Sequence, residues 1–188
     1  MSCRTTILAV VAACAAISAA GEQPLVAARD VPVPRLVQFK APRYPSLAER
    51  ARIQGDVAVQ VTVGEDGRPA DVRVSMPIPL LDEEVVKAVK GWRYEPTLVD
   101  GLPKAVVVLE PVTFRIGETD MSLGYAEIAR RPACSTILRL TAIARLRQVF
   151  PKKHKLIEKT LEALATDSDA VVAKNAVDGL ASLRAEVR

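Results

Sequence analysis

Four valines recur at every second position in the stretch GDVAVQVTV, residues 55–63. Strict alternation puts side chains of one kind on one face of an extended chain. The stretch therefore predicts a half-buried strand. The buried face would carry Val57, Val59, Val61 and Val63.

The residues on both sides of this strand extend the pattern. The sequence GEDG, residues 64–67, predicts a tight hairpin turn in which Asp66 and Gly67 take positive φ. A second strand would follow through residues 72–76. Before the first strand, Ser46 and Glu49 have the S-x-x-E spacing of a capping box, which predicts a short helix from Ser46.

Beyond residue 80 the apolar period changes from two to 3.6 residues. Leu81, Val85, Val89 and Trp92 form one stripe, which predicts a helix whose acidic first turn suits the helix dipole. A third strand is expected over residues 104–116, interrupted at Glu110–Pro111, where Pro111 requires an edge or a bulge. The order helix, strand, strand, helix, strand predicts an α+β domain with a small antiparallel sheet over residues 42–118.

The first twenty residues have an uncharged run after Arg4, which predicts a secretory signal peptide or a short membrane anchor over residues 1–20. A third interpretation is a lipoprotein, with Cys14 in VAAC as the lipidation site. All three place the rest of the chain outside the cytoplasm. Residues 21–41 are proline-rich and predict an extended linker.

Residues 122–188 lack alternation and show helical periodicity. Apolar positions repeat at an offset of 34 residues, so that Leu138 and Leu146 correspond to Val172 and Leu180. The spacing predicts a HEAT-like pair of helices, with a plain helical hairpin as the alternative. Because two repeats are few for a solenoid, these helices are expected to dock on the strand domain or on something else.

Groups for catalysis or metal binding are scarce. The chain has one histidine, His154, in a basic and exposed context, and Cys134 is the only cysteine beyond residue 14. Cys134 is expected to be a buried small residue on a helix. We therefore predict no enzyme activity, no metal and no cofactor. The region 121–188 carries a net charge of +5, from 12 basic and 7 acidic residues, and is interpreted as a solvated or envelope-facing surface and not as a nucleic-acid site.

Several motifs in order resemble the TonB C-terminal domain. They are PRYP at 42–45, IQGDVAVQVTVGEDGRPADVRV at 53–74, LLDEEVVKAVKGWRYEP at 80–96 and VTFRI at 112–116. The fold signature comprises Gly55, Gly67, Trp92, Tyr94 and Pro96. Trp92 is expected to plug the core, and Tyr94 to bury its ring and leave its hydroxyl in water.

The resemblance implies a mechanism. A TonB-type domain in the periplasm of a Gram-negative bacterium engages an outer-membrane TonB-dependent receptor, whose TonB-box peptide adds as a strand beside the last strand. An inner-membrane ExbB/ExbD-type motor would supply the energy, and the N-terminus would associate with the membrane. The implied contact residues are Arg43, Tyr44, Ala105, Val106, Val107, Val108 and Leu109.

Two functions remain open on this basis. The first is coupling to outer-membrane transport by strand addition. The second is an exported or lipid-anchored envelope scaffold that uses the same fold for another protein contact, because the helical tail and the short linker depart from the family pattern.

Overall fold

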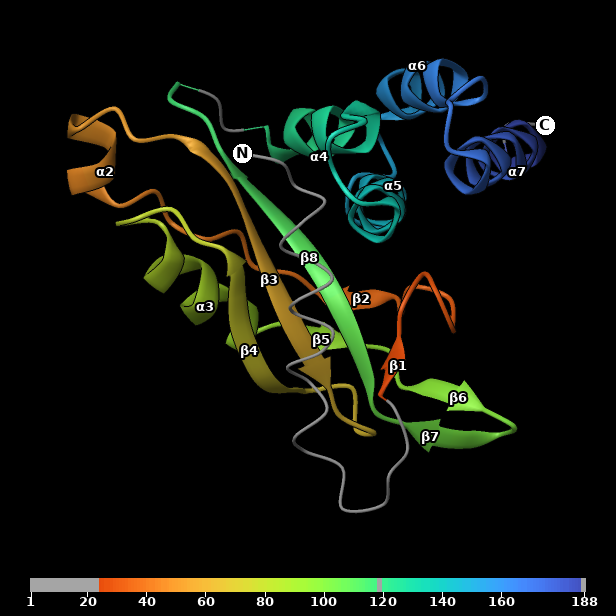
Figure 1. The fold of residues 1–188 in the computed structure, drawn as a ribbon, viewed down its shortest axis with the longest axis horizontal. Helices are drawn as coiled ribbons and strands as arrows, with labels where there is room; N and C mark the ends of the chain where they lie inside the picture. The colour runs from red at the N-terminus through yellow and green to blue at the C-terminus, as the bar shows by residue number, and fades with distance from the viewer. Residues whose placement is uncertain (1–23, 118–119, 187–188) are drawn as a thin grey trace.

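The computed structural model describes residues 24–117 and 120–186. The predicted signal peptide and Cys14 lie outside these residues. A four-stranded sheet with the order β1-β8-β3-β4 forms the centre (Figure 1). Its long strands are β3 (Gly55–Val63), β4 (Pro69–Met76) and β8 (Val106–Phe114), and β3 pairs antiparallel with both neighbours.

Two helices accompany the sheet within the predicted domain. They are α2 (Ser46–Arg50) and α3 (Asp82–Lys90). The helix α2 begins at Ser46 as predicted, but no capping box forms, because Pro45 occupies the N-cap and no side chain caps the first turn. The order α2, β3, β4, α3, β8 confirms the predicted α+β arrangement.

Within the described residues, four helices follow β8. They are α4 (Met121–Arg130), α5 (Thr136–Val149), α6 (His154–Leu164) and α7 (Ala170–Glu186). The helix α4 packs on α5 and α6, and α7 packs on α5 and α6. The tail is therefore two stacked helix pairs and is larger than one hairpin; its HEAT-like character stays a prediction.

The sheet carries a hydrophobic core on each face. The α3 core contains the alternating valines of β3, together with Val85, Val89 and Trp92. The tail core contains Ala58 and Leu109 of the sheet and the apolar sides of α4–α7. Figure 1 shows α3 and the tail helices on opposite sides of the sheet. The strand β3 was predicted to be half-buried; it is buried on both faces because the tail helices cover the second one.

The segment predicted to be a linker is folded onto the domain. It contains β1 (Leu25–Val26), which pairs parallel with β8, and β2 (Leu36–Gln38), which pairs antiparallel with β5 (Arg93–Tyr94). The linker prediction is therefore wrong for these residues. Its prolines favour extended backbone, and extended backbone also suits a short strand when a sheet edge lies beside it.

Two smaller expectations also need correction. In the hairpin turn only Gly67 has positive φ, at 74°, and Asp66 instead accepts a hydrogen bond from the Arg68 backbone N–H at 2.9 Å. The strand β8 is not interrupted at Glu110–Pro111, and both residues stay in register with β3. Pro111 is tolerated because no described strand pairs with the other side of β8 at that position.

The chain reverses between β6 (Thr97–Val99) and β7 (Leu102–Lys104). Asp100 and Gly101, with φ of 53° and 77°, form the two-residue turn of this hairpin. Leu98 and Leu102 are exposed on it.

The docking of α4 on β8 depends on Gly124. A Cβ atom at Gly124 would lie 2.4 Å from the Thr113 Cβ. We expect Gly124→Ala to lower the free energy of unfolding by up to about 2 kcal/mol, because overpacking costs about 1–3 kcal/mol and alanine in a helix returns about 1 kcal/mol. Chemical denaturation measures this change.

Gly179→Ala is the matched control for Gly124→Ala. Gly179 lies in α7, and its added Cβ would meet only the ends of two flexible side chains, Leu161 at 3.2 Å and Arg147 at 3.5 Å. This variant is expected to be neutral or slightly stabilising. Equal effects of the two substitutions would contradict the close approach of α4 to β8.

Candidate functional site

The outer edge of β8 is the candidate site, and β1 already occupies part of it. Val106 and Val107 pair with Leu25 and Val26, and the Ala27 backbone N–H donates to the Val107 carbonyl at 2.8 Å. The inner edge pairs with β3 at all nine positions of β8. The prediction of a free receiving strand is thus wrong at Val106 and Val107, because the residues before Val31 fold back onto the sheet.

The side chains expected to receive a partner are mostly buried. Val106, Val107, Val108 and Leu109 are buried, and Ala105 is exposed. An added strand is bound through backbone groups at the edge, and each of Val106–Leu109 is at most 8% exposed as a whole residue, backbone included. A partner strand therefore gains access only when the cover of this edge, which includes β1, is displaced.

The stretch of this edge with which a strand can pair is short, and α4 and α5 also pack on β8. Because residues of a strand alternate in the side to which their N–H and C=O groups point, Leu109, Pro111 and Thr113 face the same side as Val107. Pro111 has no N–H to donate. Within the described residues no strand pairs with this edge beyond Val107. Before Pro111 the outer edge therefore offers both a donor and an acceptor only at Val107 and Leu109, and β1 already pairs at Val107.

Arg43 and Tyr44 lie at the opposite end of β8. The Tyr44 ring is 5.3 Å from the Phe114 ring, and its hydroxyl donates to the Ile53 carbonyl at 2.7 Å. Phe114 is eight residues from Val106, which corresponds to roughly 27 Å along a strand. Arg43 is exposed. The structure does not bring these two residues and the start of β8 into one site.

The fold-signature residues hold the end of α3 against the hairpin turn. Trp92 is fully buried, and its indole N–H donates to the Lys40 carbonyl at 2.8 Å. The Tyr94 backbone N–H donates to the Gly67 carbonyl at 2.8 Å. Pro96 is exposed, and Gly55 opens β3 where an added Cβ would lie 2.5 Å from the Ile78 Cδ1. The predicted core plug is thus in place.

The Tyr94 hydroxyl differs from the expectation. The whole side chain is buried, hydroxyl included, because Tyr94 lies beneath Arg145 of α5, whose Cζ is 5.6 Å from the ring centroid. Burial, and then the nearby Glu110 carboxylate, raise the pKa of Tyr94. The same two causes raise the pKa of Tyr125 on α4. Both phenols therefore stay neutral at physiological pH.

A buried ion pair joins the tail to the sheet at this point. The Glu110 carboxylate accepts from Arg145 Nη2 at 2.5 Å and from Nε at 3.0 Å, and both side chains are fully buried. Arg145 Nη1 also donates to the Pro34 carbonyl at 2.9 Å and to Gln148 at 2.6 Å. Burial alone lowers the pKa of Arg145, but Glu110 outweighs it and the net shift is upward.

Sequence analysis missed this pair, although one signal for it was present. Glu110 is the single charged residue in the run VVVLEPV, and a charge in a buried strand requires a partner. The partner could not be identified, because Arg145 is one of several arginines on helices whose packing the sequence leaves open.

Other candidate groups do not form sites. Within the described ranges no three His, Cys, Asp or Glu side chains are grouped as metal ligands would be, and none of the described helices is long and apolar enough to cross a membrane. Cys134 is buried as predicted, but it lies between α4 and α5 and not on a helix. His154 is exposed at the start of α6.

The antiparallel sheet backed by α3, with Trp92 and Tyr94 packed at the end of that helix, defines a class of domain. Residues 40–116 match the family described as Gram-negative bacterial TonB protein C-terminal, so this part of the chain is a TonB C-terminal domain, as the sequence indicated. The match also confirms the prediction that this domain is not an enzyme. The helices α4–α7 lie outside the matched residues.

Individual relatives agree with this class. Protein TonB of Escherichia coli K12 is 35% identical over 88 residues, which cover 46% of this chain and 35% of that protein. Protein TonB of Pseudomonas aeruginosa is 40% identical over 67 residues, which cover 35% and 20%. The solution NMR structure of the Pseudomonas aeruginosa TonB C-terminal domain is 34% identical, covers 45% of this chain and 87% of that one, and has a TM-score of 0.38. The chain thus spans about a third or less of the length of these two curated relatives.

Proposed function

We propose that this chain is a periplasmic TonB-type interaction module that couples to an outer-membrane transporter of a Gram-negative bacterium. A short extended segment of the transporter adds as a strand at the outer edge of β8, at residues 106–109. The match of residues 40–116 to the TonB C-terminal family supports the class of function. An energy-supplying contact with an inner-membrane motor would involve the N-terminal region, outside the described residues.

One observation carries the choice of edge. The outer edge of β8 already accepts a short added strand, since Ala27 N–H donates to the Val107 carbonyl at 2.8 Å. Main-chain hydrogen bonds of this kind supply the affinity in strand-addition complexes, and pockets for alternate side chains supply specificity. The backbone at Val106–Leu109 is therefore suited to bind a peptide in the same manner.

The experiment measures binding of a transporter-derived TonB-box peptide by fluorescence anisotropy. Val107→Pro is expected to weaken binding at least tenfold, because it removes an N–H on the outer edge; each tenfold corresponds to about 1.4 kcal/mol. The native Pro111 on the same edge shows that β8 accommodates a proline there. Val107→Ala is the matched control and should retain binding. Equal affinity of both variants and the wild type would overturn strand addition at this edge.

A second function is favoured by a separate observation. The buried contact between Arg145 and Glu110 attaches the tail firmly to the sheet, and the edge is partly filled. Both features suit an envelope scaffold that uses the TonB-like fold and its tail for another protein contact. Two results together would support the scaffold function over strand addition. No TonB-box peptide would bind, and cross-linking in the periplasm would recover a partner whose capture depends on the tail.

A further inference from the structure

The segment Pro24–Val31 makes the contacts that a bound peptide would make. Leu25 and Val26 run parallel to β8, and the next residue, Ala27, donates to Val107. Val26 is 6% exposed and Ala27 is 0% exposed. Leu25 is half-buried and packs on the α3 core, as Val106 does. The segment therefore fills the edge through its backbone and through a row of aliphatic side chains.

The strand pairing that holds this segment on the sheet is short. Only two residues of β1 are paired with β8. After them the chain turns back, and the Asp30 carboxylate accepts from the Val26 N–H at 2.8 Å and from the Arg29 side chain. Arg29 and Asp30 are exposed to solvent. Ala28 has φ of 68°, a backbone conformation that costs about 1–2 kcal/mol for a residue with a side chain.

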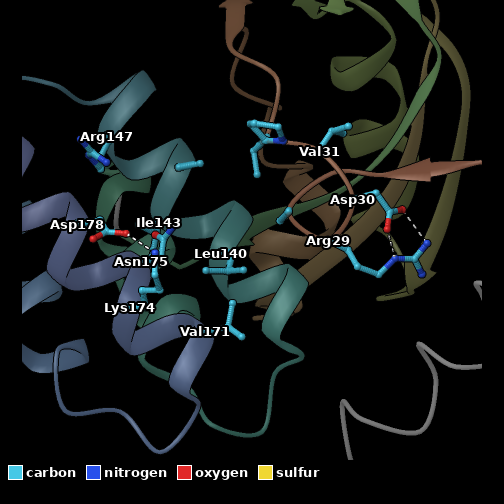
Figure 2. Close-up of a pocket in the computed structure, with 14 residues that line it drawn as sticks. Arg29, Asp30, Val31, Leu140, Ile143, Arg147, Val171, Lys174, Asn175 and Asp178 are labelled. Carbon is cyan, nitrogen blue, oxygen red and sulfur yellow. Dashed lines mark hydrogen bonds and ion pairs between the residues drawn. The ribbon is translucent and has the colours of Figure 1, made fainter. Parts of the chain in front are cut away.

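A cleft separates the turn from the tail. About 530 Å³ of space lies between residues 28–33 on one side and α5 and α7 on the other (Figure 2). Ile143 and Leu140 of α5 and Lys174 of α7 line its helical wall. Ala28 of the turn packs on the tail core. The tail helices also pack on one another, α4 on α5 and α6, and α7 on α5 and α6, so release of the turn leaves those contacts in place.

We propose that Leu25–Ala27 is a built-in occupant of the β8 edge, which a partner strand must displace. The inference rests on the strand addition proposed above and adds two properties to it. The partner's segment runs parallel to β8 with aliphatic residues at the Leu25 and Val26 positions and a small residue at the Ala27 position. The apparent affinity for that segment equals its intrinsic affinity multiplied by the fraction of molecules in which β1 is released.

The burial of each position sets the chemistry of the partner. A charged side chain at the Val26 or Ala27 position would be desolvated without an opposite charge, which is strongly unfavourable. A large side chain at the Ala27 position has no room, since Ala27 is fully buried. The partner is therefore an extended aliphatic peptide segment, and not an acidic or aromatic one.

The first test uses a labelled peptide with the sequence of residues 24–30, PLVAARD, and the full chain. Val26→Asp places a charge at a buried position and is expected to release β1. Anisotropy should then show at least tenfold tighter binding of the peptide than to the wild type. Val37→Asp is the matched control, because it makes the same change of charge at a position in β2, outside the segment, that is 58% exposed. It should bind the peptide as the wild type does.

The second test locks β1 in place with a disulfide. Leu25 and Val106 are register partners in neighbouring strands and pack on the same core. The double variant Leu25→Cys/Val106→Cys is expected to lose peptide binding when oxidised and to regain it when reduced, while each single variant responds to neither treatment. This test does not depend on the folding of Val26→Asp.

Three results would overturn the inference. The first is equal peptide affinity of the wild type and a folded Val26→Asp chain. The second is peptide binding by the oxidised Leu25→Cys/Val106→Cys variant. The third is a wild-type dimer that the peptide dissociates, because the occupant of the edge would then be a second copy of the chain. If the 24–30 peptide binds Val26→Asp but no TonB-box peptide does, the inference stands and the proposed function falls. If TonB-box peptides bind the wild type and Val26→Asp equally, the function stands and the inference falls.

Discussion

Arg145→Ala is expected to lower the free energy of unfolding by about 3–5 kcal/mol, because it leaves the Glu110 carboxylate buried without a counter-charge. It also removes the donor to the Pro34 carbonyl. Chemical denaturation gives the energy. Amide hydrogen exchange should show faster exchange in β1 and β2, since the same guanidinium holds the chain between these strands.

A double variant separates the charge from the packing. Glu110→Met/Arg145→Met replaces both partners with apolar side chains. Its free energy of unfolding is expected to be closer to that of the wild type than that of either single variant, because buried ion pairs can often be replaced by apolar residues without loss of stability. Arg184→Ala is a control for removal of a surface arginine, since its contact with Glu162 is solvent-exposed at 3.7 Å; it should change stability by less than about 1 kcal/mol. A loss below 1 kcal/mol for Arg145→Ala would contradict the buried pair.

Gly67→Ala is expected to destabilise the domain by about 2–5 kcal/mol, as the sum of left-handed strain and overpacking. Gly67 has φ of 74°, and a Cβ there would lie 2.1 Å from the Tyr94 carbonyl oxygen. The neighbour is backbone of a buried residue, and it cannot turn aside as a flexible side chain would. Thermal and urea denaturation of the full chain measure the loss.

Gly101→Ala controls for the backbone conformation alone. Its φ is 77°, and an added Cβ would meet nothing within 4 Å. The free energy of unfolding of this variant should fall by only about 1–2 kcal/mol, which is the cost of an alanine in the left-handed conformation. The difference between the two variants measures the contact with Tyr94, and the absence of any difference would contradict that contact.

The elements of the domain could be predicted where one short stretch of sequence determines them. The alternating valines of β3 and the stripe that ends at Trp92 each bury a face whatever the rest of the chain does. The pairing of Gly67 with Tyr94 explains physically why a glycine turn and an aromatic residue occur together in the motif.

The state of the site could not be predicted, because its contacts join distant parts of the chain. The strand β1 has two residues and is stabilised by an edge about eighty positions away. The second buried face of β3 depends on α4 and α5, which carry no sequence mark of their docking partner. The hydroxyl of Tyr94 was expected in water, and the guanidinium that covers it comes from residue 145.

The position of Arg145 also determines how a mechanical load would pass through the chain. Tension applied on the N-terminal side of Pro24 acts first on β1, where two register pairs resist it. The next anchor is the Pro34 carbonyl, held by a guanidinium that is also bound to Glu110 of β8. The stretch from Pro24 to Pro34 thus combines a weak attachment with a strong one. Moderate tension would detach the strand that fills the edge, while the sheet and the tail stay joined.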